Sequence, residues 1–182
     1  MKLNALSLGI LGIFVFPLHP ASAAPPQGLH GKSILVTWTE ARVQRHGGEP
    51  NFYTVSARHD LRIYISATGR VFSRLTNTTG AGSGNTEQVA GGGASPIPAR
   101  VPAFGPEGMT LFMPFKSGGM RRLLATFDAS FSSCNARVAN AKQQGAATQI
   151  AHSPITKKDV EFSSVTPAAA SCTVSAGNVF GH

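Results

Sequence analysis

Apolar and polar side chains alternate along several stretches of this chain, a two-residue period that is typical of β-strands with one buried face. In the clearest stretch, Leu61, Ile63 and Ile65 alternate with Arg62 and Tyr64. The pattern predicts a strand whose leucine and isoleucine side chains enter a core while its arginine and tyrosine side chains face solvent.

The longest predicted strand covers residues 32–45. Ile34, Val36 and Trp38 recur at every second position and form an apolar face, on which we expect the large indole of Trp38 to anchor the core. From Glu40 to Arg45 the sequence becomes charged. We therefore expect this end of the strand to extend into solvent.

Turn residues divide the remaining strand patterns into two predicted hairpins. The first hairpin joins residues 60–66 to residues 70–75, and the second joins residues 109–115 to residues 120–128. Further strands are expected at 52–57, 159–165 and 171–180.

Two segments have a weaker pattern. Cys134, Ala136 and Val138 alternate as in a strand, whereas the alanines and glutamines of residues 136–147 would permit a short helix, and we favour the strand. The segment 76–108 is rich in glycine and proline and has no period. We expect a long loop there, either a flap over a binding site or, as we favour, a plain excursion between strands.

These elements amount to about eight to ten strands and at most one short helix, near residues 136–147. Strands that follow one another through closely spaced turns, without regularly interspersed helices, indicate an all-β fold. We expect a single-domain antiparallel β-sandwich or barrel, and the pattern leaves the choice between the two open.

The first 23 residues have the composition of a secretory signal peptide. Lys2 precedes an uncharged apolar run at Leu6–Phe16, and Ala21-Ser22-Ala23 provides small residues at a cleavage site. The run is shorter than the about 20 residues that a membrane-spanning helix needs. We therefore expect an exported domain at residues 24–182, without a transmembrane segment, in the periplasm or outside the cell.

Cysteine usage and charge refine this expectation. Cys134 and Cys172 are the two cysteines of the chain and lie outside any Cys-x-x-Cys motif, which in an exported protein favours a structural disulfide between them.

Residues 24–182 hold 15 basic residues, ten of them arginine, against 8 acidic ones, a net charge of +7. This charge suits an anionic partner or simply solubility, and its even spread favours solubility. No basic run is interleaved with aromatics, so we expect no nucleic acid partner.

The sequence contains no motif of a catalytic, metal-binding or nucleotide-binding site, and we expect no metal and no cofactor. His59 and Asp60 are adjacent, but neighbours on a strand point to opposite faces, so we expect no catalytic dyad there. A hydrolase site would have to be assembled by the fold from scattered histidines and carboxylates. Candidate carboxylates on predicted strands are Glu40, Asp60, Asp128 and Glu161.

A binding surface is the sharper hypothesis. Arg62, Arg74, Arg121 and Arg122 lie on predicted strands, and neighbouring hairpins would gather them with Tyr64 on one exposed sheet face. Arginine forks and an aromatic ring suit carboxylates or sugar acids. We expect a non-enzymatic exported protein that binds an anionic envelope component or a protein. A small envelope hydrolase and a structural assembly subunit are the alternatives.

Overall fold

The structure is a computed structural model of the chain. It describes residues 23–79, 86–91, 102–116, 118–142, 145, 148–152 and 158–181. The predicted signal peptide lies outside the described residues except for Ala23, which forms an isolated β-bridge with Phe104. Within the described part of the chain, no helix is long and apolar enough to cross a membrane.

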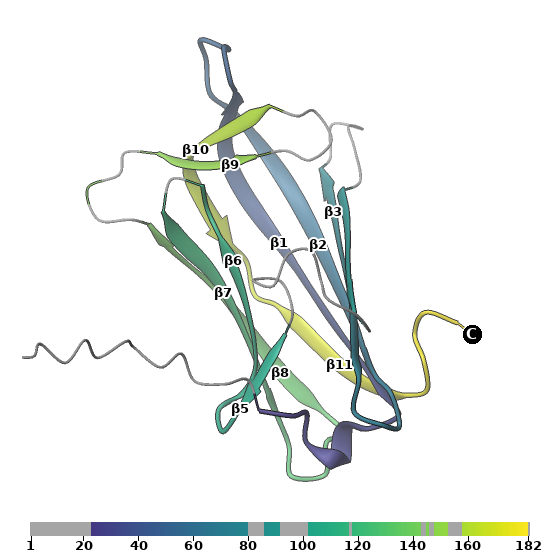
Figure 1. Ribbon diagram of the computed structural model, residues 1–182. Coiled ribbons are helices and arrows are strands. Elements are labelled where there is room, and N and C mark those ends of the chain that lie inside the picture. The colour runs from purple at the N-terminus through teal and green to yellow at the C-terminus, as the bar shows by residue number, and fades with distance from the viewer. Residues whose placement is uncertain are drawn as a thin grey trace, which may run out of the picture.

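Antiparallel strands make up almost all of the regular structure (Figure 1). A single turn of 3-10 helix, η1 (Gln27–Leu29), precedes the first strand. The strands are β1 (Lys32–His46), β2 (Tyr53–Ile65), β3 (Val71–Thr79), β4 (Thr86–Gly91), β5 (Ala103–Gly105), β6 (Gly108–Pro114), β7 (Gly119–Phe127), β8 (Cys134–Lys142), β9 (Gln149–His152), β10 (Asp159–Pro167) and β11 (Ser171–Ala176). The predicted all-β fold is confirmed.

The strands form two sheets that face each other (Figure 1). The larger sheet has seven strands in the order β4-β3-β2-β1-β10-β9, with β11 also paired to β1. The smaller sheet has four strands in the order β5-β6-β7-β8. One edge of the long strand β1 pairs with β2, while its other edge is shared by β11 at Lys32–Thr37 and by β10 at Glu40–His46. Almost the whole of β10 therefore lies beside the charged half of β1.

A disulfide joins the two sheets. Cys134 at the start of β8 and Cys172 on β11 form this bond, with their Cα atoms 5.4 Å apart. The predicted disulfide is confirmed. It closes a loop of 38 residues. A disulfide that closes a loop of that length stabilises a fold by about 3–4 kcal/mol, mainly because it restricts the unfolded chain.

The prediction of a long loop at 76–108 is only partly correct. β3 continues to Thr79, and both β4 and β5 lie within this segment. Thr76 and Thr78 face Asp60 and Arg58 across the β2–β3 pair, so the length of β2 provides a partner for a segment that is polar but rich in β-branched threonine. The strand predicted from the alternation of Cys134, Ala136 and Val138, in preference to a helix, is confirmed as β8, and part of 143–147 lies outside the described residues.

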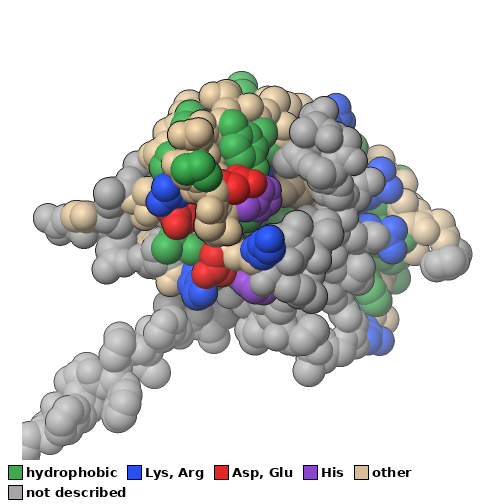
Figure 2. All heavy atoms as spheres, turned by 90° about the horizontal axis from the view of Figure 1, so that it is seen from above, with side chains coloured by type: hydrophobic (Ala, Val, Ile, Leu, Met, Phe, Trp, Pro, Cys, Tyr) green, Lys and Arg blue, Asp and Glu red, His purple; other side chains and the backbone are tan. Residues whose placement is uncertain are grey.

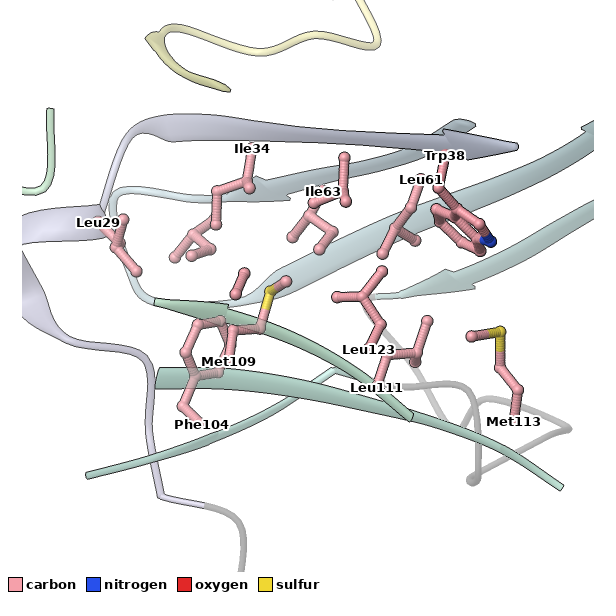
Figure 3. Packing of buried hydrophobic residues seen from close by; sticks show 13 residues of the cluster. Leu29, Ile34, Trp38, Leu61, Ile63, Phe104, Met109, Leu111, Met113 and Leu123 are labelled. Atoms are coloured by element: carbon pink, nitrogen blue, oxygen red, sulfur yellow. The ribbon is translucent and has the colours of Figure 1, made fainter. Parts of the chain in front are cut away.

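An apolar core fills the space between the sheets at the end near η1 (Figure 3). Ile34 and Trp38 of β1 and Ile63 of β2 point toward Leu111 of β6 and Leu123 of β7, and each of these side chains is buried. Trp38 is 2% exposed and occupies the predicted anchor position. Burial of such side chains supplies the main favourable free energy of folding.

A second, smaller apolar cluster lies at the opposite end of the sandwich. It consists of Phe115, Val160 and Phe162, and the rings of the two phenylalanines meet edge to face with centroids 6.3 Å apart. The two apolar clusters are separate. The charged half of β1 lies between them.

Candidate functional site

The inward face of β1 changes from apolar to charged without leaving the interior. Glu40 is 0% exposed and Arg42 is 6% exposed. The expectation that Glu40–Arg45 would extend into solvent is therefore wrong for these two side chains. The strand keeps its alternation, so Glu40 and Arg42 stay on the same face as Trp38. β10 pairs with this half of β1 along its edge, and Arg121 of β7 reaches Glu40 from the opposite sheet.

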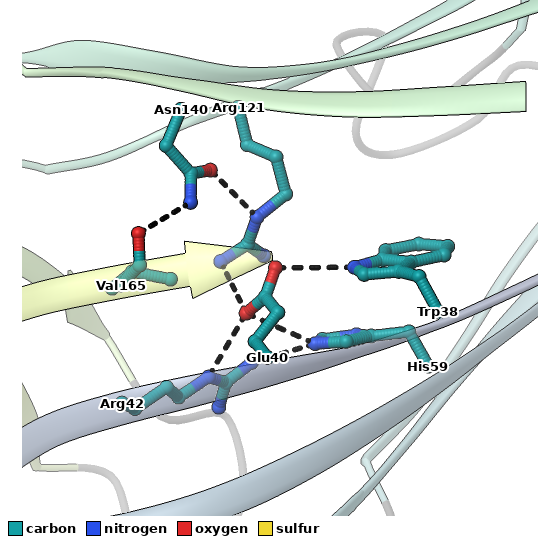
Figure 4. Close-up of polar contacts among 7 residues, drawn as sticks. All are labelled: Trp38, Glu40, Arg42, His59, Arg121, Asn140 and Val165. Atoms are coloured by element: carbon teal, nitrogen blue, oxygen red, sulfur yellow. Dashed lines mark hydrogen bonds and ion pairs between the residues drawn. The ribbon is translucent and has the colours of Figure 1, made fainter. Parts of the chain in front are cut away.

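Glu40 is the centre of a buried network of polar side chains (Figure 4). Its Oε1 accepts a hydrogen bond from Trp38 Nε1 at 3.1 Å. Its Oε2 accepts hydrogen bonds from Arg42 Nε at 3.0 Å and from Arg121 Nη2 at 2.8 Å. We call this network the ionic layer, and its side chains are those of Trp38, Glu40, Arg42, His59, Arg121 and Asn140.

Arg121 carries the ionic layer across to the smaller sheet. It lies on β7, and its guanidinium reaches Glu40 on β1. Arg121 Nε donates to Asn140 Oδ1 at 3.1 Å, and Asn140 Nδ2 donates to the carbonyl oxygen of Val165 at 3.0 Å. The layer therefore ties β1, β7, β8 and β10 together through directional contacts.

His59 completes the layer from β2. Its ring stacks on that of Trp38, with centroids 4.6 Å apart and planes 8° from parallel. His59 Nε2 lies 2.7 Å from Arg42 Nη2. The same nitrogen lies 3.3 Å from Glu40 Oε2, which joins His59 to the carboxylate at the centre of the layer. In the described part of the chain, His59 Nδ1 is buried without a hydrogen-bond partner.

The electrostatics of the layer keep Glu40 ionised and His59 neutral. Burial raises the pKa of the Glu40 carboxyl, but His59, Arg121 and Arg42 act in the opposite direction and lower that pKa to about 2. Burial lowers the pKa of His59, the Glu40 carboxylate opposes this change, and the two arginines add to it. Burial also lowers the pKa of Arg121 to about 10, which leaves it protonated at neutral pH.

This arrangement suits structure better than catalysis. Both oxygens of Glu40 already accept hydrogen bonds, and a carboxyl group with a pKa of about 2 is a poor base at neutral pH. Asp60 lies on the opposite face of β2 from His59 and pairs with Arg58 at 3.0 Å, so these neighbours form no dyad. Among the described residues, no group of three or more His, Cys, Asp or Glu is placed to hold a metal ion.

The end of the sandwich near β9 and β10 carries exposed and half-buried ion pairs rather than one sign of charge. Lys116 pairs with Asp159 at 2.6 Å, Asp159 also contacts His152, and Arg45 pairs with Glu161 at 2.8 Å. Figure 2, which views the molecule from above, shows acidic, basic and histidine side chains intermingled on that end. Such paired charges give no net attraction for an anion.

Three of the five predicted binding residues do come together. Arg62 of β2 lies directly across from Arg74 of β3, and Tyr64 lies across from Phe72. The turn between these strands sets the register, because Ser66 and Arg70 pair through a backbone hydrogen bond and Gly69 adopts a φ of +79° that glycine permits. Arg62 and Tyr64 therefore lie in adjacent rows on the outer face of the larger sheet.

Further side chains extend this group. Arg58 joins it as the partner of Asp60, and Arg70 places its guanidinium 5.6 Å from the centroid of the Phe72 ring. The Tyr64 and Phe72 rings are stacked with centroids 6.2 Å apart. We call this surface the arginine face, and it comprises Arg58, Asp60, Arg62, Tyr64, Arg70, Phe72 and Arg74. Four arginines against one aspartate give it a net charge of +3.

Arg121 and Arg122 lie elsewhere. Arg121 is 8% exposed and belongs to the ionic layer. Arg122, its neighbour on β7, points to the outer face of the smaller sheet, where it pairs with Glu107 at 3.0 Å and lies over the Phe112 ring. The structure therefore divides the five predicted residues among the arginine face, the interior and the opposite surface.

Sequence reasoning missed both the ionic layer and four members of the arginine face, which are Arg58, Asp60, Arg70 and Phe72. The signal for the layer was the unbroken alternation from Trp38 through Glu40 to Arg42. The signal for Arg70 and Phe72 was the hairpin register around Gly69. Comparison with protein families, with curated proteins and with solved structures finds no match for this chain.

Proposed function

We propose that this chain is an exported, non-enzymatic binding protein that holds an anionic polymer on the arginine face. The observation that carries the proposal is the cross-strand pair of Arg62 and Arg74 beside the aromatic pair of Tyr64 and Phe72. Arg62 is exposed, and its guanidinium makes no hydrogen bond or ion pair within the described residues, which leaves its donors available to a ligand.

The chemistry of the arginine face fits a carboxylate-bearing sugar polymer. A guanidinium offers parallel donors that match the two oxygens of a carboxylate, and aromatic rings provide an apolar surface for a sugar ring. Adjacent strands are about 4.8 Å apart and successive residues on one face are about 7 Å apart, so the arginine row and the aromatic row lie within one sugar unit of each other. An extended polymer can therefore contact both rows.

Export is part of the same proposal. The first 23 residues resemble a secretory signal in composition. The disulfide between Cys134 and Cys172 agrees with an oxidising compartment, because such bonds are rare where thiols are kept reduced. A periplasmic or extracellular polymer with carboxylate groups is the corresponding class of ligand.

The test is binding of residues 24–182 to polygalacturonate at low and high salt, with dextran as the uncharged control. We expect salt-sensitive binding that falls at least tenfold in the variant Arg62→Gln/Arg74→Gln. Arg137 of β8 is exposed and lies across from Leu124 on the outer face of the smaller sheet. The matched control, Arg122→Gln/Arg137→Gln, removes the same charge from that face and should bind as the original protein does. Equal losses in the two variants would show attraction by overall charge and would contradict the proposal.

Assembly with another protein is a second candidate function, favoured by one observation. Phe112 is 39% exposed and Met120 is 37% exposed on the outer face of the smaller sheet, opposite the arginine face. The two residues lie on paired strands, two positions apart, and contiguous exposed apolar surface is typical of protein contacts. Self-association that persists at high salt and is lost in Phe112→Ser/Met120→Ser, measured by light scattering, would support this function over polymer binding.

A further inference from the structure

The segment that follows β11 turns onto the outer face of the larger sheet (Figure 1). The backbone amide of Gly177 donates to the carbonyl oxygen of Gly31 at 2.9 Å. Ser33 Oγ donates to the carbonyl oxygen of Gly177 at 2.6 Å and accepts from the backbone amide of Val179 at 2.9 Å. We call residues 177–181 the C-terminal strap.

The strap then reaches the arginine face. The Phe180 ring lies 5.3 Å from the guanidinium carbon of Arg74. Ser33 is on β1 and Arg74 is on β3, so the strap passes from one to the other over the intervening strand β2. Ser33 lies in register with Tyr64, which places this crossing beside the aromatic row.

Burial on the outer face of β1 follows the path of the strap. Ser33 points away from the core but is only 2% exposed, whereas Thr39, farther along the same face, is exposed. An outer-face residue in a two-layer sandwich is ordinarily open to solvent. The strap therefore covers a part of the surface that an extended ligand would need.

Few contacts hold the strap in place. Its anchors are the Ser33 hydroxyl, the amide of Gly177 and the ring of Phe180. Val179 is 37% exposed, and both Gly177 and Gly181 are exposed. A segment with few buried contacts opens at a small free-energy cost compared with unfolding of the sheet beneath it.

We propose that the C-terminal strap regulates the arginine face by competing with the ligand for the surface around Arg74. This inference rests on the proposed function, since it names the control of the same site. The ligand first engages the exposed guanidinium of Arg62 and then displaces Phe180 from Arg74. The apparent affinity is reduced by the fraction of molecules in which the strap is closed.

The experiment compares polygalacturonate binding by Phe180→Ala, Ser33→Ala and Phe112→Ala. The first two variants weaken the strap, and we expect each to raise affinity by about two- to fivefold, the factor that corresponds to ~0.5–1 kcal/mol for an exposed ring–cation contact. Phe112→Ala removes a comparable ring beside Arg122 on the opposite surface and should leave affinity unchanged. Unchanged or weaker binding by Phe180→Ala would overturn the proposal that the strap regulates the arginine face.

Amide hydrogen exchange gives a second readout that separates the two proposals. We expect polygalacturonate to speed exchange at Val179 and Phe180, because binding lifts the strap. Slower exchange at these amides would mean that Phe180 itself contacts the polymer. That result would overturn regulation by the strap but would leave the proposal of polymer binding intact. If neither the original protein nor the Phe180→Ala variant binds the polymer, the proposed function itself fails.

Discussion

The interior of this sandwich has two halves that share the same strands but use opposite chemistry. β1 contributes Val36 to the apolar core and Glu40 to the ionic layer, and β7 contributes Leu123 to the first and Arg121 to the second. The apolar half gains free energy from contacts without strict direction, whereas the ionic half depends on hydrogen bonds at fixed angles. The same alternation of side chains can therefore build either kind of interior.

The comparison also separates charges that hold the fold from charges that face solvent. Arg121 and Arg122 are adjacent in sequence, but one is paired inside with Glu40 and the other is paired outside with Glu107. The buried pair has given up its water, so each partner needs the other. An exposed pair keeps its water and contributes about 0–1 kcal/mol.

The largest expected effect comes from breaking the ionic layer at its centre. Glu40→Ala leaves the guanidiniums of Arg42 and Arg121 without their carboxylate, and removal of one partner of a buried pair costs about 3–5 kcal/mol. Urea unfolding at pH 7 measures this loss. A cost below about 1 kcal/mol would place Glu40 with the exposed pairs and would remove the distinction between the two halves.

Truncation in the apolar half should cost about 3 kcal/mol through lost burial and a cavity. Leu123→Ala is the appropriate variant, since Leu123 is 0% exposed and follows Arg121 on the inner face of β7. Measuring the two stability costs at both pH 7 and pH 3 separates the apolar half from the ionic half. The cost of Leu123→Ala should be the same at pH 7 and pH 3, whereas the cost of Glu40→Ala should shrink as Glu40 protonates in the unfolded state. Parallel pH dependence of the two costs would contradict this assignment.

Acid should weaken the fold in two stages that belong to the ionic layer. His59 has a pKa below its ordinary value of 6.5, so its contribution to stability is complete above that pH and declines as the pH falls through and below it. The contribution of Glu40 declines below pH 4.5, toward its folded pKa of about 2. Urea midpoints between pH 8 and pH 3 measure both stages. In His59→Gln the first stage should disappear, and its persistence would assign that stage to another group.

The smallest expected effect is that of Arg122→Gln. The ion pair of Arg122 with Glu107 is exposed on both sides, and its loss should change the free energy of unfolding by less than about 1 kcal/mol. Thermal melting alongside Arg121→Gln provides the contrast, because Arg121 lies inside. Similar losses for these two neighbours would contradict the division between buried and exposed charge.

Local patterns predicted much of this fold and less of its interior. Alternation identified the strands around Ile34 and Leu61, and the pair of cysteines in a chain that we expect to be exported predicted the bond between Cys134 and Cys172. The burial of Glu40 depends on β10 and β7, which come from distant parts of the sequence. Charge alone favours solvent exposure, so only a knowledge of these neighbours reverses that expectation.

The arginine face was partly predictable for the same reason. Residues on one hairpin, such as Arg62, Tyr64 and Arg74, are placed by a local turn and were grouped correctly from sequence. Arg121 belongs to a different hairpin, and its side of the strand depends on how the two sheets face each other. The alternation of side chains along a strand shows that Arg121 and Arg122 point to opposite faces of β7, but it does not show which of the two is buried.

The central claim is that the ionic layer is a structural element in which Glu40 stays ionised. An NMR titration of the Glu40 side-chain carboxyl carbon in residues 24–182 tests this claim most directly. The layer predicts a carboxylate signal that stays unchanged from pH 7 to pH 4 in the folded protein, in keeping with a pKa of about 2. A midpoint in the folded protein at or above the ordinary value of 4.5 would contradict the claim and would return Glu40 to the candidates for proton transfer.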